Sequence, residues 1–535
     1  MIELPQYLEN PLVLVVLFLL FGSLTAAMTP LIKLLARKTG AIDRGGYRRV
    51  SWSEVPLLGG LGISVPVLVF YVCSGLAGSL IVRNWELIYR LNPSWLDPLM
   101  SFAFGRASFS RSFIILAAGG IAILALGLLD DLRGMRARVK LLGQFAIAIF
   151  ICATGCVIES FYIPLVGQVE LNPNLGVIIS ILWIVGLINA FNIIDGLDGL
   201  ATGVALIACL TLVALGATTG NIFIVFTCAP LAGSLAAFLI FNFPPASIFL
   251  GDTGSMFIGY ALATITLMGT YKVETALIIM APMLALSFPI FETLLSMIRR
   301  FVRGVPIFAG DRHHTHHRLL EKGFTGKQVV LILYAITFLL ACAGYLFLII
   351  PDGSGWFWLP GFILVVTLVG VAWWTGYLRR AAIGRIFYRR RRNTVLAAFS
   401  RYAIQSLISR SATISPFEIL HLCRRELRLS FLDARFENGD VLIGASGTSP
   451  KVHPGRAPDN PIERLRLKSI SGISISVRYQ FAHEPDISES QDIAACLAQI
   501  FEQAGSGSLF SKVIKKQQEI REAAKGEPTG SFVDR

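Results

Sequence analysis

Residues 189–200 read NAFNIIDGLDGL and join two long apolar runs, at 177–194 and 200–218. Each run is near the length of about 20 residues that an α-helix needs to cross a bilayer. Asp195 and Asp198 lie between the runs, although an ionised side chain in the bilayer core costs several kcal/mol. The stretch therefore predicts two membrane helices that meet at an acidic corner near one membrane surface.

The spacing within this stretch indicates how its polar side chains are arranged. Asp195 and Asp198 are three residues apart, which places them on one face of a helical turn. Asn192 and Asn189 would lie one and two turns before them, and the neighbouring glycines let a ligand approach the backbone. Such a carboxylate-rich corner suits a hard cation and phosphate oxygens. The alternative is a helix cap followed by a glycine-rich turn.

The composition extends this interpretation to most of the chain. Of the 535 residues, 54% are hydrophobic and 15% are charged, against about 25% charged residues in soluble domains. Eleven apolar runs approach spanning length, which predicts an all-α polytopic membrane protein with about 11 transmembrane helices. The runs lie at about 11–28, 57–80, 112–130, 141–159, 177–194, 200–218, 221–241, 256–271, 275–298, 328–350 and 356–378.

Charges beside the runs predict the orientation in the membrane. Glu3 and Glu9 precede the first run and Lys33, Arg37 and Lys38 follow it, so the N-terminus is expected outside. The loops then assigned to the cytoplasm are rich in Lys and Arg, and the net charge of +13 suits anionic lipids. We expect a multi-pass protein of the bacterial inner membrane, with a small outer hairpin at 161–171.

Four polar motifs emerge on the predicted cytoplasmic side. They are LLDDLRG at 128–134, the stretch at 189–200, FLGDTGS at 249–255 and DRHHTHH at 311–317. Acids on one membrane face beside basic loops indicate a site where a soluble anion meets a membrane-held partner. A secondary transporter, the alternative from another class, would carry its acids at the midplane on interrupted helices.

Asp130 and Asp131 end the third apolar run. Adjacent residues on a helix point about 100° apart, so only one of the two is expected to face the site. The alternative is an interfacial acid pair balanced by Arg133 and Arg136.

Asp252 is expected in a tight, glycine-bracketed turn just before a helix. A diphosphate would then bind at the N-terminus of that helix while Asp252 holds a divalent metal. The alternative is that Asp252 or Ser255 serves only as the helix cap.

Four histidines occur among the seven residues at 311–317. No HExxH motif or cysteine partner accompanies them, which disfavours zinc. With Arg312, imidazoles of this segment are expected to donate hydrogen bonds to phosphate or sugar oxygens. A surface loop without function is the alternative.

Together, the DD pair, NxxNxxDGLDGL, GDTGS and DRxHxHH, in this order, resemble the polyprenyl-phosphate N-acetylhexosamine-1-phosphate transferases of glycosyltransferase family 4. These enzymes start O-antigen (lipopolysaccharide) and teichoic-acid linkage synthesis, and phospho-MurNAc-pentapeptide translocase is a more distant relative. The motifs cover about 30–325, and the topology continues to about 378.

The resemblance implies transfer of an N-acetylhexosamine 1-phosphate, with GlcNAc as the expected sugar, from a UDP-sugar to undecaprenyl phosphate. UMP is released, Mg²⁺ is required (Mn²⁺ is the alternative ion), and the active site faces the cytoplasm. A phospho-MurNAc-pentapeptide transferase is the alternative within the family. Membrane lipids are expected partners and nucleic acids are not, while the sequence leaves a homodimer open.

The resemblance also implies roles for single residues, and two positions depart from its pattern. Implied catalytic residues are Asp130, Asp131, Asp195 and Asp198; implied substrate-binding residues are Asn189, Asn192, Arg312, His314, His316 and His317; implied metal ligands are Asp252 and Asp195. Ser53 and Glu54 stand where histidine or lysine is common, and Glu292 stands where aspartate is expected. Direct displacement of UMP and a covalent aspartyl intermediate both stay open.

Four domains are expected along the chain: a transferase domain at 1–378, a basic linker at 379–399, a cytoplasmic α+β domain at 400–505 and a tail at 506–535. Strands are predicted within 431–446 and 473–481, between helices at 394–410 and 491–505. This order is faintly similar to GAF-type modules, and we expect a regulatory or scaffolding role.

Overall fold

The computed structural model describes residues 12–43, 55–83, 107–163, 167–270, 283–284, 286–303, 314–350 and 356–375, together with short segments between 398 and 497. Two compact units are present. The first comprises residues 1–299 and 308–379, and the second comprises residues 300–307 and 380–535.

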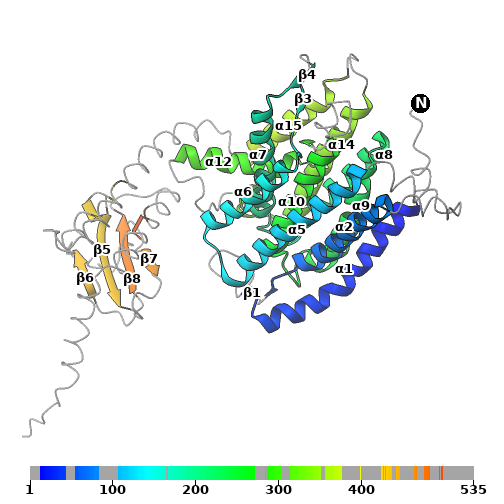
Figure 1. Cartoon of the computed structure of the whole chain (residues 1–535). Helices are drawn as coiled ribbons and strands as arrows, with labels where there is room; N and C mark the ends of the chain where they lie inside the picture. The colour runs from blue at the N-terminus through cyan, green and yellow to red at the C-terminus, as the bar shows by residue number, and fades with distance from the viewer. Residues whose placement is uncertain are drawn as a thin grey trace, which may run out of the picture. The chain divides into compact units, whose positions relative to one another are not determined.

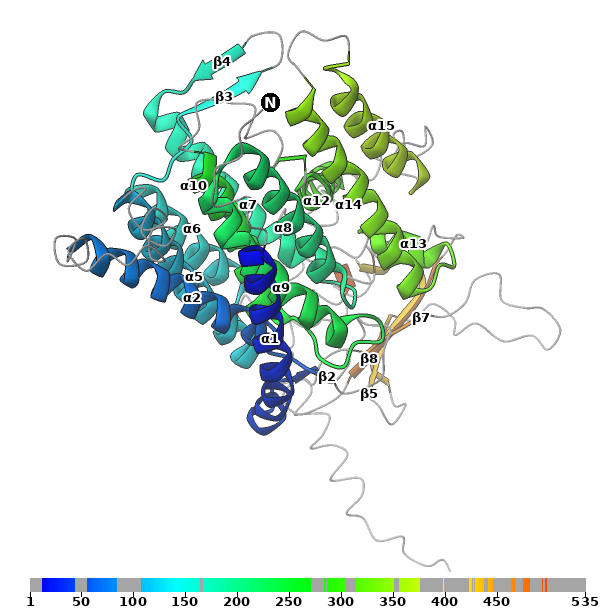
Figure 2. The same cartoon turned by 90° about the vertical axis from the view of Figure 1, so that its right-hand side faces the viewer.

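Membrane-length helices dominate the first unit. Among the described residues, seven helices are long and apolar enough to cross a membrane. They are α1 (Leu12–Thr39), α2 (Gly60–Arg83), α5 (Ala107–Arg133), α7 (Pro173–Ile194), α8 (Leu200–Thr219), α9 (Ile222–Asn242) and α14 (Gly326–Ile349). They pack as a bundle (Figures 1 and 2). The chain is therefore a mostly helical, polytopic membrane protein, as predicted.

Other helices are shorter or more polar. They are α6 (Ala137–Ala153), α10 (Gly251–Thr270), α12 (Ser287–Arg303), α13 (Thr315–Glu321) and α15 (Leu359–Trp374). Every predicted apolar run overlaps a helix, but those at α6, α10, α12 and α15 are outside the set of seven. The α6 and α15 helices have only 17 and 16 residues, and α10 opens with the polar sequence GDTGS. The short helix α13 was not predicted from the sequence.

The α10 helix packs between α5 and α7 and also contacts α2. Glycines allow these close approaches. A Cβ atom on Gly127 of α5 would lie 2.7 Å from the Cα of Thr253, and one on Gly259 of α10 would lie 2.7 Å from the Cα of Ile188. The backbones of α5 and α7 therefore approach α10 as small residues permit in membrane proteins. This packing brings segments near 130, 190 and 252 together.

Two small antiparallel pairs complete the first unit. β3 (Ser160–Ile163) pairs with β4 (Gly167–Glu170), which confirms the predicted hairpin. β1 (Ile42–Asp43) pairs with β2 (Val55–Pro56). The Phe249 N–H donates to the carbonyl of Pro56 in β2 (2.9 Å), which ties this second pair to the segment before α10.

The second unit contains one antiparallel sheet. Its strands are β5 (Leu429–Phe436), β6 (Val441–Ala445), β7 (Glu463–Arg466) and β8 (Ile475–Phe481), in the order β6-β5-β8-β7. β5, β6 and β8 confirm the predicted strands, whereas the short, charged β7 was not anticipated. The predicted helices at 394–410 and 491–505 lie almost wholly outside the described residues. The domain boundaries and the GAF-type resemblance stay predictions.

Candidate active site

The junction between α7 and α8 is a turn. Asp195 is the C-cap residue that follows α7, and Gly199 before α8 has a φ of +74°, a left-handed conformation that favours glycine. The prediction that Asp195 and Asp198 share a helical turn is therefore wrong. Instead, Asp198 Oδ2 accepts a hydrogen bond from the Ala246 N–H (2.9 Å) and ties this turn to the loop after α9.

Asn242, at the end of α9, makes a second connection, which was not predicted from the sequence. Its Oδ1 accepts hydrogen bonds from the Gly199 N–H (3.1 Å) and the Thr202 hydroxyl (2.9 Å), and its Nδ2 donates to the Ile248 carbonyl (2.9 Å). Because Asn242 is buried, these bonds are shielded from water. The turn at 195–199 and the loop before α10 thus form one rigid corner.

Asp131 caps α10. Its carboxylate accepts hydrogen bonds from the backbone N–H groups of Asp252 and Thr253 (both 2.9 Å) and from the Thr253 hydroxyl. Asp131 therefore occupies two of the N–H groups at this helix N-terminus, where a diphosphate was predicted to bind, and that binding stays a prediction. Asp252 lies within the first turn of α10, and Gly251, with a φ of +73°, begins that helix.

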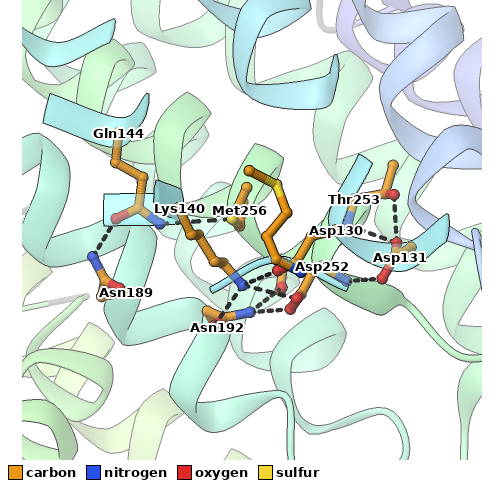
Figure 3. A network of polar contacts seen from close by, with 11 residues as sticks. Asp130, Asp131, Lys140, Gln144, Asn189, Asn192, Asp252, Thr253 and Met256 are labelled. Carbon is orange, nitrogen blue, oxygen red and sulfur yellow. Dashed lines mark hydrogen bonds and ion pairs between the residues drawn. The ribbon is translucent and has the colours of Figure 1, made fainter. Parts of the chain in front are cut away.

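Asp130 points the other way, as expected for adjacent helical residues (Figure 3). Its Oδ1 accepts a hydrogen bond from the Met135 N–H (2.6 Å), and its Oδ2 lies 2.9 Å from Lys140 Nζ. Lys140 Nζ also lies 2.8 Å from Asp252 Oδ2 and 3.3 Å from Asn192 Oδ1. The Lys140 ammonium thus joins α5, α6, α7 and α10.

The two asparagines of α7 support this network. Asn192 Nδ2 donates to Asp252 Oδ1 and to Ser255 Oγ (3.1 Å). Asn189 Nδ2 donates to Oε1 of the buried Gln144 (2.6 Å). Lys140 and Gln144 were absent from the predicted site. Their i, i+4 spacing on α6, facing asparagines spaced i, i+3 on α7, is the sequence signal that could have revealed them.

The described histidines are not a surface loop, so that alternative is wrong for them. His314 and His316 are buried, and their rings stack 5.5 Å apart. A Cβ atom on Gly196 would lie only 2.8 Å from His316 Nε2, so the histidine segment rests against the turn after α7. Burial, together with the neighbouring His317 and His314, lowers the pKa of His316 to about 3 and keeps it neutral at pH 7. Arg312 and His313 lie outside the described residues.

A pocket of about 390 Å³ lies at this corner. Its polar lining includes Asp195, Asp198, His317 and Lys327, and Phe249 and Leu250 contribute apolar surface. Asp195 comes one helical turn after Asn192, and Leu250 comes two residues before Asp252. The pocket and the Lys140 network are therefore adjacent. The fold brings Asp130, Asn192 and Asp252 into the network and Asp195, Asp198 and His317 to the pocket.

Comparison with known proteins assigns the chain to a family. The sequence profile of glycosyl transferase family 4 matches residues 113–270. A probable undecaprenyl-phosphate N-acetylglucosaminyl 1-phosphate transferase of Bacillus subtilis is 33% identical over 68% of this chain and 91% of its own length. The chain belongs to glycosyl transferase family 4. It is therefore a transferase, and this excludes the secondary transporter.

Further relatives of this glycosyl transferase are named for a different lipid or a different sugar. A decaprenyl-phosphate N-acetylglucosaminephosphotransferase of Mycobacterium tuberculosis is 30% identical over 57% of this chain and 74% of its own length. A phospho-N-acetylmuramoyl-pentapeptide-transferase of a Geobacillus strain is 31% identical over 46% of this chain and 77% of its own length.

The segment after β2 gives this glycosyl transferase a rigid site. The N–H groups of Gly59 and Gly60 donate to the carbonyls of Phe249 (3.0 Å) and Leu250 (2.9 Å). A Cβ atom on Gly60 would lie 2.1 Å from the backbone nitrogen of Gly254, so only glycine fits there. The backbone at Gly59 and Gly60 therefore packs directly against the start of α10. Ser53 and Glu54, the departures before it, lie outside the described residues.

Oxygen atoms of three side chains surround Lys140. Carboxylates of Asp130 and Asp252 and the amide oxygen of Asn192 converge on Lys140 Nζ, and Mg²⁺ prefers such oxygen ligands. Among the described residues, no group of three or more His, Cys, Asp or Glu side chains is arranged to hold a metal. Asp195 lines the pocket, so its predicted pairing with Asp252 as a metal ligand stays a prediction.

Proposed function

We propose that this enzyme transfers N-acetylglucosamine 1-phosphate from UDP-GlcNAc to undecaprenyl phosphate and releases UMP, as the first membrane step of an envelope polysaccharide. The names of its relatives in Bacillus subtilis and Mycobacterium tuberculosis support the sugar phosphate and the polyprenyl phosphate acceptor. The relative that is named a phospho-N-acetylmuramoyl-pentapeptide-transferase matches a smaller part of the chain, which favours GlcNAc as the sugar.

One observation carries this proposal: two acids, a lysine and an asparagine from four helices converge beside a pocket that further acids line. The acceptor phosphate and the diphosphate of the sugar nucleotide repel each other, so cationic groups must cancel their charge before in-line displacement. Lys140 supplies one fixed positive charge at the network, and His317 and Lys327 supply hydrogen-bond donors at the pocket. Catalysis would then rest on positioning and charge cancellation more than on a strong base.

We further propose Mg²⁺ (or Mn²⁺) as the cofactor, held by oxygens of Asp252, Asp130 and Asn192. A divalent ion there would neutralise the phosphate oxygens of the leaving UMP. Asp130 accepts hydrogen bonds from the Met135 N–H and from Lys140, and these contacts hold its carboxylate in place for a ligand or charge-orienting role.

The finer topology is also part of the proposal. Eleven crossings with the N-terminus outside would place Asp130, Asp195, Asp252 and His316 at the cytoplasmic face of the bacterial inner membrane. The Lys- and Arg-rich loops beside these residues support that orientation. The C-terminal unit would have a regulatory or scaffolding role.

Incubation of the purified full chain with undecaprenyl phosphate, MgCl₂ and a panel of UDP-sugars tests this function. We expect UMP from UDP-GlcNAc, and its loss in Asp252→Asn, because that change removes a charge at the network. UMP from UDP-MurNAc-pentapeptide alone would move the enzyme to the other branch of the family. Full turnover by Asp252→Asn would remove Asp252 from the mechanism.

A further inference from the structure

The α12 helix has its polar side inward and its apolar side outward. Glu292, Ser296 and Arg299, at i, i+4 and i+7, are 1%, 0% and 8% exposed. The large apolar side chains of Leu294, Met297 and Ile298 are 52%, 41% and 59% exposed and face away from the bundle. An amphipathic helix of a soluble protein shows the reverse pattern, so the outer face of α12 suits lipid. The buried polar side chains of its inner face are therefore expected to have a role inside the protein.

Glu292 contacts the start of the histidine helix. Its Oε1 accepts a hydrogen bond from the Thr315 N–H (2.8 Å) and lies 3.3 Å from His314 Nδ1. Thr315 is the first residue of α13, and the side chain of His314, the residue before it, makes no capping hydrogen bond. Glu292 thus caps α13 from a different helix, with its negative charge at the positive end of α13.

The position of α13 matters because this helix has only seven residues and carries two site histidines. His316 rests against Gly196, where a Cβ atom would be 2.8 Å from its Nε2, and His317 lines the pocket. A helix this short has little stability of its own. Its anchors therefore determine where both imidazoles lie relative to Asp195.

Glu292 itself does not line the pocket. Its carboxylate is buried against His314 and Thr315, so any effect on substrate passes through α13. This separates its role from that of Asp195 and Asp198, which reach the pocket directly.

We propose that Glu292 is a positioning residue: through its hydrogen bond to Thr315 it fixes α13, and thereby sets His316 and His317 for the sugar nucleotide. The inference rests on the proposed function for the substrate. The anchoring of α13 is independent of it.

Variants of the full chain in detergent separate these two parts. Glu292→Ala removes the acceptor, and Glu292→Gln keeps an oxygen at the same reach. Thr315→Pro keeps Glu292 and removes the N–H donor, together with the threonine hydroxyl, at a helix position that tolerates proline. Glu321→Ala, at the exposed end of α13, is the matched control.

Hydrogen exchange of 314–321, without substrate, and the KM and kcat for UDP-GlcNAc are the readouts. In Glu292→Ala and Thr315→Pro we expect exchange at least ten times faster and KM raised about tenfold or more, with a smaller change in kcat. Glu292→Gln should restore most of both values, and Glu321→Ala should match wild type.

Unchanged exchange in both Glu292→Ala and Thr315→Pro would overturn the anchor. Faster exchange with an unchanged KM would overturn the link from α13 to substrate. If Glu292→Ala does not fold, Thr315→Pro and Glu292→Gln still decide. Failure of the wild-type enzyme to use UDP-GlcNAc would instead count against the proposed function, because the exchange measurement needs no substrate.

Discussion

Lys140 determines how charge is arranged in the site. Its ammonium lies within 2.9 Å of both Asp130 and Asp252, whose negative charges would otherwise repel each other. Asn192 joins the same contacts through its amide. A lysine beside a membrane helix is expected from the positive-inside rule alone. Lys140 was therefore interpreted as a topology signal, and its contacts with the two carboxylates were not predicted.

Replacement of Lys140 by methionine should lower kcat/KM about 100-fold, or about 2.7 kcal/mol, because two half-buried carboxylates lose their shared partner. Initial rates of UMP release measure this effect. Arg138→Met, an exposed change two residues away, is the control and should keep near wild-type rates. Equal rates in the two variants would contradict the assigned contacts of Lys140.

At the scale of elements, the site depends on short segments that rest against each other. The turn at 195–199 is fixed by Asn242 and Asp198, and α13 packs on that turn through His316 and Gly196. Hydrophobic runs predicted the long helices because about 20 apolar residues have few other solutions in a bilayer. The turn after α7 was mispredicted because residue spacing does not reveal the left-handed Gly199.

Gly196→Ala tests the contact between the turn and α13. The added methyl group would lie 2.8 Å from His316 Nε2, so α13 or the turn must shift. We expect the KM for UDP-GlcNAc to rise about tenfold, in line with a cost of about 1–3 kcal/mol for overpacking. Gly186→Ala in α7, where a Cβ atom meets nothing within 4 Å, should leave KM unchanged. A wild-type KM in Gly196→Ala would refute this contact.

His316 should make stability depend on pH. Its pKa is about 3 in the folded protein, against about 6.5 in an unfolded chain. Between these values only the unfolded state binds the proton, so stability falls on acidification below pH 6.5, by at most about 1.4 kcal/mol per pH unit. The thermal midpoint should therefore drop less between pH 7.5 and 5.5 in His316→Gln than in wild type. Equal drops would exclude His316 as the cause.

At the scale of the whole molecule, residues from α5, α6, α7, α10 and α13 form one site because α10 is packed between α5 and α7. The order of the motifs in the sequence predicted that they emerge on one membrane face. It could not predict that Asp131 would cap α10 while Asp130 faces Lys140, since only the packing of α5 on α10 distinguishes these neighbours. The central claim is that these segments share the cytoplasmic face.

Accessibility labelling in intact cells tests that claim most directly. Single cysteines at Arg133, Ser247 and Lys327, which are exposed beside the motifs, and at Asn174, exposed at the other end of α7, would be introduced with Cys73 replaced by serine. An impermeant maleimide should label Asn174→Cys in intact cells and the other three only after permeabilisation. Labelling of Arg133→Cys, Ser247→Cys and Lys327→Cys from opposite sides of the membrane would contradict the account.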